Sequence, residues 1–414
     1  MRHTKKISLI ITGENLLGFL VAFDIAAYVC QTFIYVDLGI IYIEQVITIL
    51  SSFLIMMFTT KIIPNTFLKG YFAFFLFAAM SIFWSSSTSV YYMRVRDIFS
   101  CLLLALNITQ YCFVTCDKND IKKRANNVLS FFLIFVCIMT VYCYYVAGSD
   151  ILSWARLGKD VYVSGNSSFI LYTCYLTLAS YIAIARIFTS DKKNIYIILS
   201  VLLYASCVFT GVRKLMVLPF LFLYFFLLYR YRNNAAKILG VTIGVGVLAV
   251  LAVWIIMHYS SSMATRINQL LLGLSGSANQ EASYSERSLL ASLAWKCFKE
   301  HPIIGYAIGQ FRIYSVHHGG PELYAHCNWL EILADLGIIG FAIYYGTQFI
   351  ILVRAYKKQS IVCCFVFAFI LANMFSDIFQ VSYYYDGHVV LFAVCSCLLL
   401  SDYIKDDKSQ QSES

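Results

Sequence analysis

The fold of this chain is decided by the stretch Tyr324-Ala-His-Cys-Asn-Trp-Leu-Glu-Ile-Leu-Ala-Asp-Leu-Gly-Ile-Ile-Gly340. It joins a long polar loop to an apolar run that continues to about residue 353. His326, Asn328 and Glu331 lie where the loop and the apolar run meet. An apolar run of this length matches a helix that crosses a hydrocarbon layer of ~30 Å. The stretch therefore predicts a membrane-spanning helix with a histidine, an amide and a carboxylate at its boundary.

The rest of the chain repeats the apolar part of this pattern. It has 414 residues, of which 60% are hydrophobic and 13% charged, with 33 Phe and 31 Tyr. A soluble domain of this size fills its core with far less apolar material. We expect an all-α polytopic membrane protein with about 12 transmembrane helices, at residues 16–36, 38–58, 68–84, 97–115, 128–148, 167–189, 194–210, 213–230, 237–257, 328–353, 361–379 and 387–403.

Positive charge orients these helices. By the positive-inside rule, connections that are rich in Lys and Arg lie in the cytoplasm. Twelve spans with both termini inside place seven such clusters there: Arg2-Lys5-Lys6, Lys61 with Lys69, Lys118-Lys122-Lys123-Arg124, Arg186-Lys192-Lys193, Arg230-Arg232-Lys237, Arg354-Lys357-Lys358 and Lys405-Lys408. The net charge of +9 thus reflects topology, and no basic soluble domain indicates a nucleic-acid partner.

One large loop interrupts the membrane helices. We interpret residues 1–414 as a single integral membrane domain whose residues 258–327 form an extracytoplasmic loop. In this loop Leu289, Leu290, Leu293, Ala294, Cys297 and Phe298 follow a helical period. Pro302 should end that helix, because the residue before a proline avoids the α region. A short amphipathic helix is therefore expected in the loop.

Cysteines give no sign of a metal site. Nearly all of the 14 lie inside predicted spans, where Cys packs as a small apolar residue. Cys297 and Cys327 are the two in the large loop, and a disulfide between them stays open as an alternative to free thiols. Neither a C-x-x-C pair nor a Cys/His array is present, so no zinc site is predicted.

A second motif, His301-Pro-Ile-Ile-Gly-Tyr-Ala-Ile-Gly309, precedes the first by about 20 residues. Together the two resemble the O-antigen ligase/polymerase family, in which H-P-x-x-G-x-G-x-x-F is followed by H-x-N-x-x-L-E and a Gly-rich entry into a membrane helix. The resemblance implies a membrane glycosyltransferase at the outer face of the bacterial plasma (inner) membrane. Its donor and acceptor would be polyprenyl-pyrophosphate-linked oligosaccharides, with no cofactor and with a flippase and chain-length regulators as candidate protein partners.

The resemblance assigns the general base to His326, and a histidine has the near-neutral pKa that this role needs. Asn328 or Glu331 would orient its ring. Arg213, in Thr210-Gly-Val-Arg-Lys214, stands in an outward hairpin against the positive-inside bias. Its guanidinium suits a bidentate contact with pyrophosphate, although an arginine at a helix end also snorkels to the interface.

Further binding residues are predicted in the outward loops. Arg287 resembles the arginine of a family helix that precedes H-P-x-x-G, and Arg156 and Asn166 resemble an R-x-x-G…G-N stretch. We interpret the loop histidines His301, His317 and His318 as structural. Two arginines at the leaving group would make the enzyme metal-independent.

Three functions compete on this basis. The A-H-x-N-W-L-E form, the compact loop and the many tyrosines favour a polymerase of O-antigen or capsule repeat units. A ligase that moves the finished glycan to lipid A core or protein is the alternative. The buried acids Asp24, Glu44, Asp335 and Asp377 could belong to a lipid-linked oligosaccharide flippase or other transporter, but they are scattered, so we expect them to make hydrogen bonds between helices.

Overall fold

The structure is a computed structural model, and it describes residues 13–38, 42–59, 63–115, 117–147, 168–210, 212–259 and 282–403. Within these ranges every regular element is a helix, which confirms the all-α prediction. The elements are α1 Gly13–Leu38, α2 Ile43–Phe58, α3 Thr66–Met80, η1 Ser81–Trp84, α4 Thr88–Cys112, α5 Lys118–Ala147, α7 Ser168–Thr189, α8 Lys193–Phe209, α9 Arg213–Arg230, α10 Ala235–Tyr259, α12 Ala282–Glu300, α13 Phe311–His317, α14 Asn328–Tyr356, α15 Ile361–Ser376 and α16 Asp386–Tyr403.

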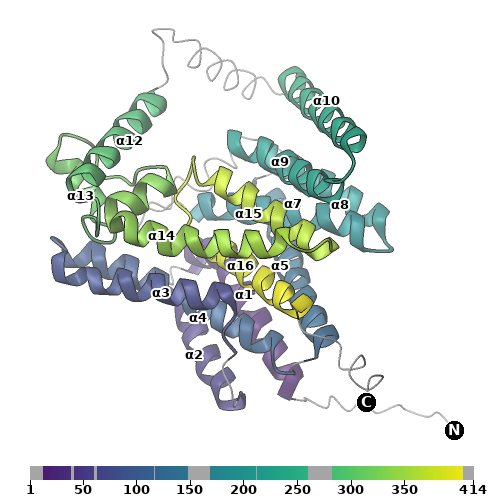
Figure 1. The fold of residues 1–414 in the computed structure, drawn as a ribbon, viewed down its shortest axis with the longest axis horizontal. Coiled ribbons are helices and arrows are strands. Elements are labelled where there is room, and N and C mark those ends of the chain that lie inside the picture. Colours follow the sequence, from purple (N-terminus) through teal and green to yellow (C-terminus); the bar gives the residue numbers. More distant parts are fainter. Residues whose placement is uncertain are drawn as a thin grey trace.

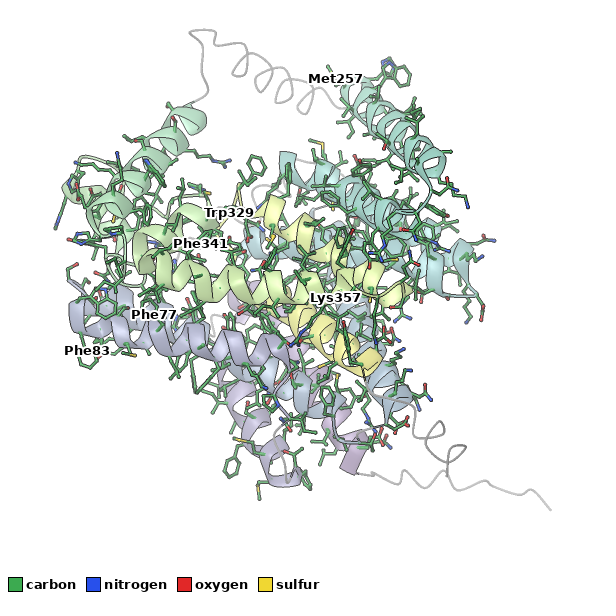
Figure 2. All side chains as sticks on the ribbon, in the orientation of Figure 1. Phe77, Phe83, Met257, Trp329, Phe341 and Lys357 are labelled. Carbon is green, nitrogen blue, oxygen red and sulfur yellow. The ribbon has the colours of Figure 1, made fainter. Side chains whose placement is uncertain are left out.

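The apolar lengths of these helices identify a membrane protein. Six of them, α1, α3 with η1, α5, α10, α14 and α16, are long and apolar enough to cross a membrane by length and composition. Large apolar side chains such as Phe83 and Met257 are exposed on the outside of the bundle, as expected of a surface that faces lipid (Figure 2). The chain is therefore a multi-pass membrane protein. All twelve predicted spans coincide with helices, but a count of twelve crossings stays a prediction.

Two helices begin well before the predicted spans. Helix α4 begins at Thr88 instead of residue 97, and α5 begins at Lys118 instead of 128. Their first turns are polar, so a hydropathy pattern misses them although the backbone stays helical. Hydropathy therefore marks the part of a helix that lies in lipid, and the helix itself extends further.

Helix α16 forms the centre of the bundle (Figure 1), and nearly all of its side chains are buried. Its Asp386 accepts hydrogen bonds from Tyr175 of α7 at 2.7 Å and from Gln31 of α1 at 3.2 Å. Asp24 of α1 likewise accepts from Asn107 of α4 at 2.8 Å, as the sequence predicted for buried acids. Because a carboxylate in hydrocarbon needs partners, these bonds connect the helices at fixed positions.

The basic clusters gather at one end of the bundle. Lys122 pairs with Asp402 at 2.6 Å, and Arg124 pairs with Glu14 at 2.8 Å. Arg232 donates to a main-chain carbonyl at the end of α14 at 2.7 Å. These contacts bring the starts of α1 and α5 to the same end as the last turns of α9, α14 and α16. We call this end the basic end.

The opposite end carries α12 and α13 (Figure 1). Helix α12 confirms the predicted amphipathic helix: it ends at Glu300, just before Pro302, and it buries Leu290, Leu293 and Cys297. These side chains pack in a small separate core against α13 and the start of α14. The three helices lie close together in Figure 1. Cys297 and Cys327 are both free thiols, so the alternative of a disulfide between them does not hold. Helix α13 was not predicted.

Candidate active site

The two sequence motifs form one structural unit, because α14 is broken where they meet. Gly337 leaves the helical conformation with φ 61° and ψ −163°. The N–H groups of Ile338 and Ile339 then donate to the carbonyls of Pro302 at 2.9 Å and Ile303 at 3.3 Å. In the other direction Tyr306 donates to the carbonyl of Ala334 at 2.9 Å. The loop 301–309 thus replaces the hydrogen bonds that the broken helix loses.

Glycine is required on both sides of this contact. A Cβ on Gly305 would lie 2.3 Å from the main-chain carbon of Asp335, and a Cβ on Gly337 would lie 2.4 Å from that of Ile303. Both residues also have positive φ, of 69° and 61°. The glycines in the two motifs therefore allow two backbones to approach closely.

The carboxylate of Asp335 holds the end of the loop through hydrogen bonds to main-chain N–H groups. It accepts the N–H of Gly309 at 2.7 Å and that of Phe311 at 2.8 Å. Gly309 belongs to the loop and Phe311 begins α13, so this buried acid of α14 bonds another helix, as expected, and also the loop before it. The broken helix and the loop before α13 are thus held together by charge-assisted hydrogen bonds.

His326 stands at the mouth of this unit, two residues before α14. Its φ is 55°, in the left-handed region that is uncommon for residues other than glycine. The N–H of the preceding Ala325 donates to the carboxylate of Glu331 at 2.5 Å. The ring packs against Tyr324, with 4.2 Å between centroids. Glu331 therefore positions the backbone that carries His326, and the described contacts of this carboxylate go to that backbone.

The positive charges of three residues from three helices act on His326: Arg287 of α12, Lys214 of α9 and Arg312 of α13. Burial, and then the positive charges of these three residues, lower the pKa of His326 to about 4. An imidazole in this setting is neutral at neutral pH, so it can accept a proton. A positive field of this kind also favours an anion next to it.

Arg312 has unused hydrogen-bonding capacity. It is 7% exposed, and its Nε and Nη2 atoms have no hydrogen-bond partner among the described residues. The Nε and Nη2 atoms of Arg94, in α4, also have no hydrogen-bond partner among the described residues. The guanidinium of Arg94 contacts Asp97 at 3.4 Å and lies over the ring of Tyr384 at 4.1 Å. Buried guanidinium donors without partners are costly, and an anionic ligand satisfies them.

Asn328 has a different place from the one expected. It is fully buried, and its amide donates to the hydroxyl of Tyr345 at 2.8 Å. Its side-chain oxygen accepts the N–H of Ser382 at 2.9 Å and that of Tyr383 at 3.2 Å. The described contacts of Asn328 thus secure the turn before α16, instead of the imidazole ring.

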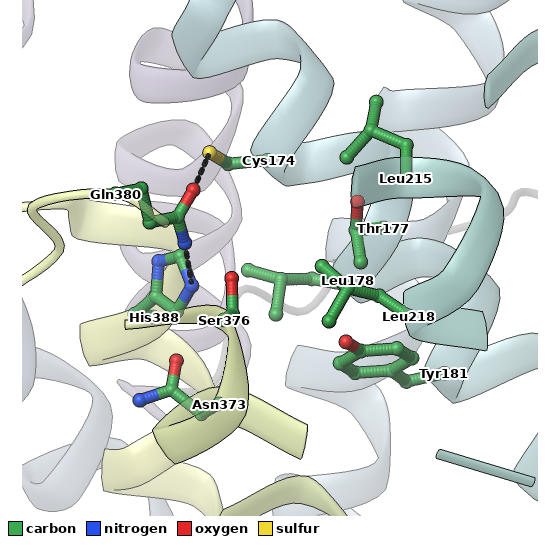
Figure 3. A pocket seen from close by; sticks show the side chains of 10 residues that line it. All are labelled: Cys174, Thr177, Leu178, Tyr181, Leu215, Leu218, Asn373, Ser376, Gln380 and His388. Atoms are coloured by element: carbon green, nitrogen blue, oxygen red, sulfur yellow. Dashed lines mark hydrogen bonds between the residues drawn. The ribbon is translucent and has the colours of Figure 1, made fainter. Parts of the chain in front are cut away.

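Lys214 connects the site to a small polar pocket between α7, α9, α15 and α16 (Figure 3). Its ammonium donates to the side-chain oxygen of Gln380, which also accepts from Cys174 at 3.4 Å. The amide nitrogen of Gln380 lies 3.5 Å from Nε2 of His388. The pocket holds about 10 Å³, which is room for one water molecule. It is too small for a sugar, so it supports Lys214 and is not a substrate site.

The remaining predicted residues are placed as follows. Arg213 begins α9 beside Lys214, but its side chain lies outside the described residues, as do Arg156 and Asn166. The loop histidines are exposed, and His301 and His318 pack on the tyrosines Tyr306 and Tyr314. No group of His, Cys, Asp or Glu that could hold a metal occurs in the described part of the chain.

Sequence reasoning missed Lys214, Arg312 and Arg94 as site residues. One signal was available: Lys214 and Arg312 are cations in connections that the positive-inside rule leaves poor in charge. Arg94 gave no such signal, because it stands just before a predicted span.

The fold and the site define a multi-pass membrane protein with a histidine and a group of cations at one membrane boundary. Comparison with known sequences shows that residues 198–345 match the O-antigen ligase family. This part of the chain is therefore similar to that family, and the match covers less than half of the chain. Lys214, Arg287, Arg312 and His326 all lie inside the matched range. The comparison with curated proteins gave no match.

Proposed function

We propose that the protein is a polysaccharide polymerase. It joins polyprenyl-pyrophosphate-linked oligosaccharide repeat units into O-antigen or capsular polysaccharide at the outer face of the plasma membrane. The observation that carries this proposal is a neutral His326 among Arg287, Arg312 and Lys214, within the range that matches the family.

In the proposed reaction His326 accepts the proton of an acceptor sugar hydroxyl. The hydroxyl oxygen forms a bond to the anomeric carbon of the donor, and the bond from that carbon to the pyrophosphate oxygen breaks. Polyprenyl pyrophosphate leaves with the electron pair. Arg287, Arg312 and Lys214, joined by Arg213, stabilise the charge that develops on it.

The cations and the base assist one another in this scheme. Without substrate they lower the pKa of His326, so the ring stays unprotonated. A bound pyrophosphate offsets their charge and strengthens the base at the moment when it is needed. Donor binding therefore prepares the proton acceptor.

The proposed orientation follows from the two ends of the bundle. The basic end faces the cytoplasm by the positive-inside rule, with both termini, so His326 faces outward. Outside the cytoplasm there is no nucleotide sugar, and a pyrophosphate donor brings its own leaving group. With four cations available to that leaving group, the reaction needs no divalent metal.

A ligase remains the second candidate, because the matching family is described as O-antigen ligase. The same base and cations serve transfer to lipid A core or protein equally well. A flippase is the candidate from another class, and the observations that favour it are the buried acids of the helices and the polar pocket at Gln380 and His388. The volume of that pocket does not admit a glycan.

One experiment separates the three. The purified protein in vesicles is given polyprenyl-pyrophosphate repeat units, with and without EDTA, and the products are sized. A ladder of lengths that EDTA does not change is expected. Transfer that occurs only when a lipid A core or protein acceptor is added indicates a ligase. Glycan that crosses the membrane without a new bond indicates a transporter, and loss of the ladder in EDTA contradicts metal independence.

A further inference from the structure

A second cavity lies at the basic end, away from His326. It holds about 490 Å³ between the α9–α10 turn and the first turn of α15, and its lining includes Arg230, Lys237, Asn233, Asn234, Gln359 and Ile361. Two of these are cations, three are side-chain amides and none is acidic. Several are exposed, so the cavity opens to the outside of the protein. Helix α9 separates it from the active site, because Lys214 and Arg230 stand at opposite ends of that helix.

Among the described residues, the two cations of this cavity have no acidic partner. Arg230 contacts the rings of Phe188 at 5.3 Å and Tyr231 at 5.9 Å, and Lys237 contacts Tyr231 at 5.3 Å. Neither forms an ion pair with a carboxylate in the described residues. Asp402, which accepts from Ser360, is already paired with Lys122. The cavity therefore presents two positive charges that no carboxylate of the described residues neutralises.

The wall of the cavity is fixed before any ligand arrives. The hydroxyl of Tyr229 donates to the carbonyl of Ala355 at 2.7 Å. The guanidinium of Arg232 lies between the rings of Tyr229 and Tyr356, at 4.4 and 4.7 Å. Since these contacts hold the end of α9 against the end of α14, a ligand pays little to order the site.

We propose that this cavity binds the headgroup of an anionic glycerophospholipid. Arg230 and Lys237 hold the phosphate, and the amides of Asn233 and Gln359 reach headgroup hydroxyls. Ile361 and Cys364 add an apolar wall that suits the start of an acyl chain and not a free ion. The site lies at the ends of membrane helices, at the depth where headgroups lie, and basic pockets in this position recognise anionic lipids. It is independent of the glycan transfer proposed above.

The test uses the full-length protein in detergent with added phosphatidylglycerol or phosphatidylcholine, and native mass spectrometry measures the bound lipid. Wild type should bind phosphatidylglycerol at least tenfold more tightly than phosphatidylcholine. The double variant R230Q/K237Q should weaken phosphatidylglycerol binding about thirtyfold, as expected for two lost charges near a membrane surface. The charge-preserving variant R230K/K237R should bind within about threefold of wild type, and it shows that any loss is not due to misfolding.

The matched control is K192Q/K193Q, which removes two exposed lysines from the α7–α8 turn at the same end. It should change binding by less than about threefold. An equal loss in this control means that only the overall charge matters, and the proposed site is then wrong. Unchanged binding in R230Q/K237Q overturns it too. Displacement of the lipid by millimolar inorganic phosphate contradicts the assignment to a lipid, whatever the outcome of the transfer assay.

Discussion

The two ends of the bundle use the same kinds of side chain in opposite ways. At the basic end Lys122 and Arg124 pair with carboxylates, and Arg232 is bonded to a main-chain carbonyl. At the site end Arg287 and Arg312 have no carboxylate within ion-pair distance in the described residues, and Lys214 has only an amide partner. Paired cations fix topology and packing, whereas unpaired cations next to a neutral histidine are available to a ligand. Arg230 and Lys237 lie at the basic end, but like the cations of the site end they have no carboxylate partner among the described residues.

The basic end and the end that carries His326 should face different compartments. A reporter fused after Gly276 should behave as extracytoplasmic, and one fused after Asn234 should behave as cytoplasmic, because positive charge is retained inside. Alkaline phosphatase activity measures the first and a cytoplasmic fluorescent reporter the second. If both fusions report the same compartment, His326 and the basic clusters do not face opposite sides and the proposed function fails.

Among point variants the largest effect is expected at the base. His326→Ala should lower the rate of chain elongation by about 10²–10⁴-fold, because it removes the proton acceptor. The rate is measured with purified protein in vesicles, and circular dichroism checks that the helices persist. His317→Ala, which changes an exposed loop histidine, should retain nearly full activity. A loss of only twofold in His326→Ala assigns the base to another residue.

The unpaired cations come next. Arg312→Gln should reduce kcat/KM by about 10–100-fold, as expected for the loss of a hydrogen bond to a charged group. Lys122→Gln is the counterpart at the basic end, where Lys122 pairs with Asp402. It should leave kcat/KM within about twofold, since an ion pair near the surface contributes little. Equal losses in the two variants would remove the distinction between paired and unpaired cations.

The broken helix provides a test of stability. Gly337→Ala should destabilise the protein by about 1–3 kcal/mol, because the backbone conformation at Gly337 is one that only glycine adopts readily. The clash with the carbonyl carbon of Ile303 at 2.4 Å adds to this. Gly346→Ala is the control on the same helix, with no atom within 4 Å of the new Cβ, and it should be neutral or slightly stabilising. Thermal unfolding measures both. Equal unfolding temperatures would mean that the loop does not dock on the break.

The smallest effect is a displaced pH profile. Since burial and three cations lower the pKa of His326 to about 4, the unprotonated base persists well below pH 6.5. The decrease in kcat/KM at acidic pH that results from protonation of His326 should therefore lie near pH 4. An unperturbed histidine would place this decrease near pH 6.5. Arg312→Gln removes one of the charges, so its acidic limb should move to higher pH. If the acidic limb of the wild-type profile lies near pH 6.5 and Arg312→Gln does not shift it, the cations do not lower the pKa of His326.

The amino-acid sequence by itself determined the class of protein, and it pointed to the segment that carries the candidate site. Hydropathy is a local property, so contiguous apolar runs predicted where the helices lie, and the loop helix before Pro302 followed from its period. The two glycine-containing motifs could be recognised because each is a continuous stretch of sequence. His326 lies in one of them, and Arg287 lies in the loop helix that precedes them. The missed starts of α4 and α5 show the limit of this reasoning, since polar first turns leave no hydropathy signal.

Only the tertiary structure decided which side chains meet. Lys214 and Arg312 are far apart in sequence, and only the tertiary structure brings them near enough for both positive charges to act on His326. Asn328 was expected to orient the ring, but its hydrogen bonds are taken by the turn before α16. Asp335 bonds the loop because Gly337 breaks the helix above it. Such pairings depend on hydrogen-bond donors and acceptors that must be satisfied across distant segments, and no local pattern encodes them.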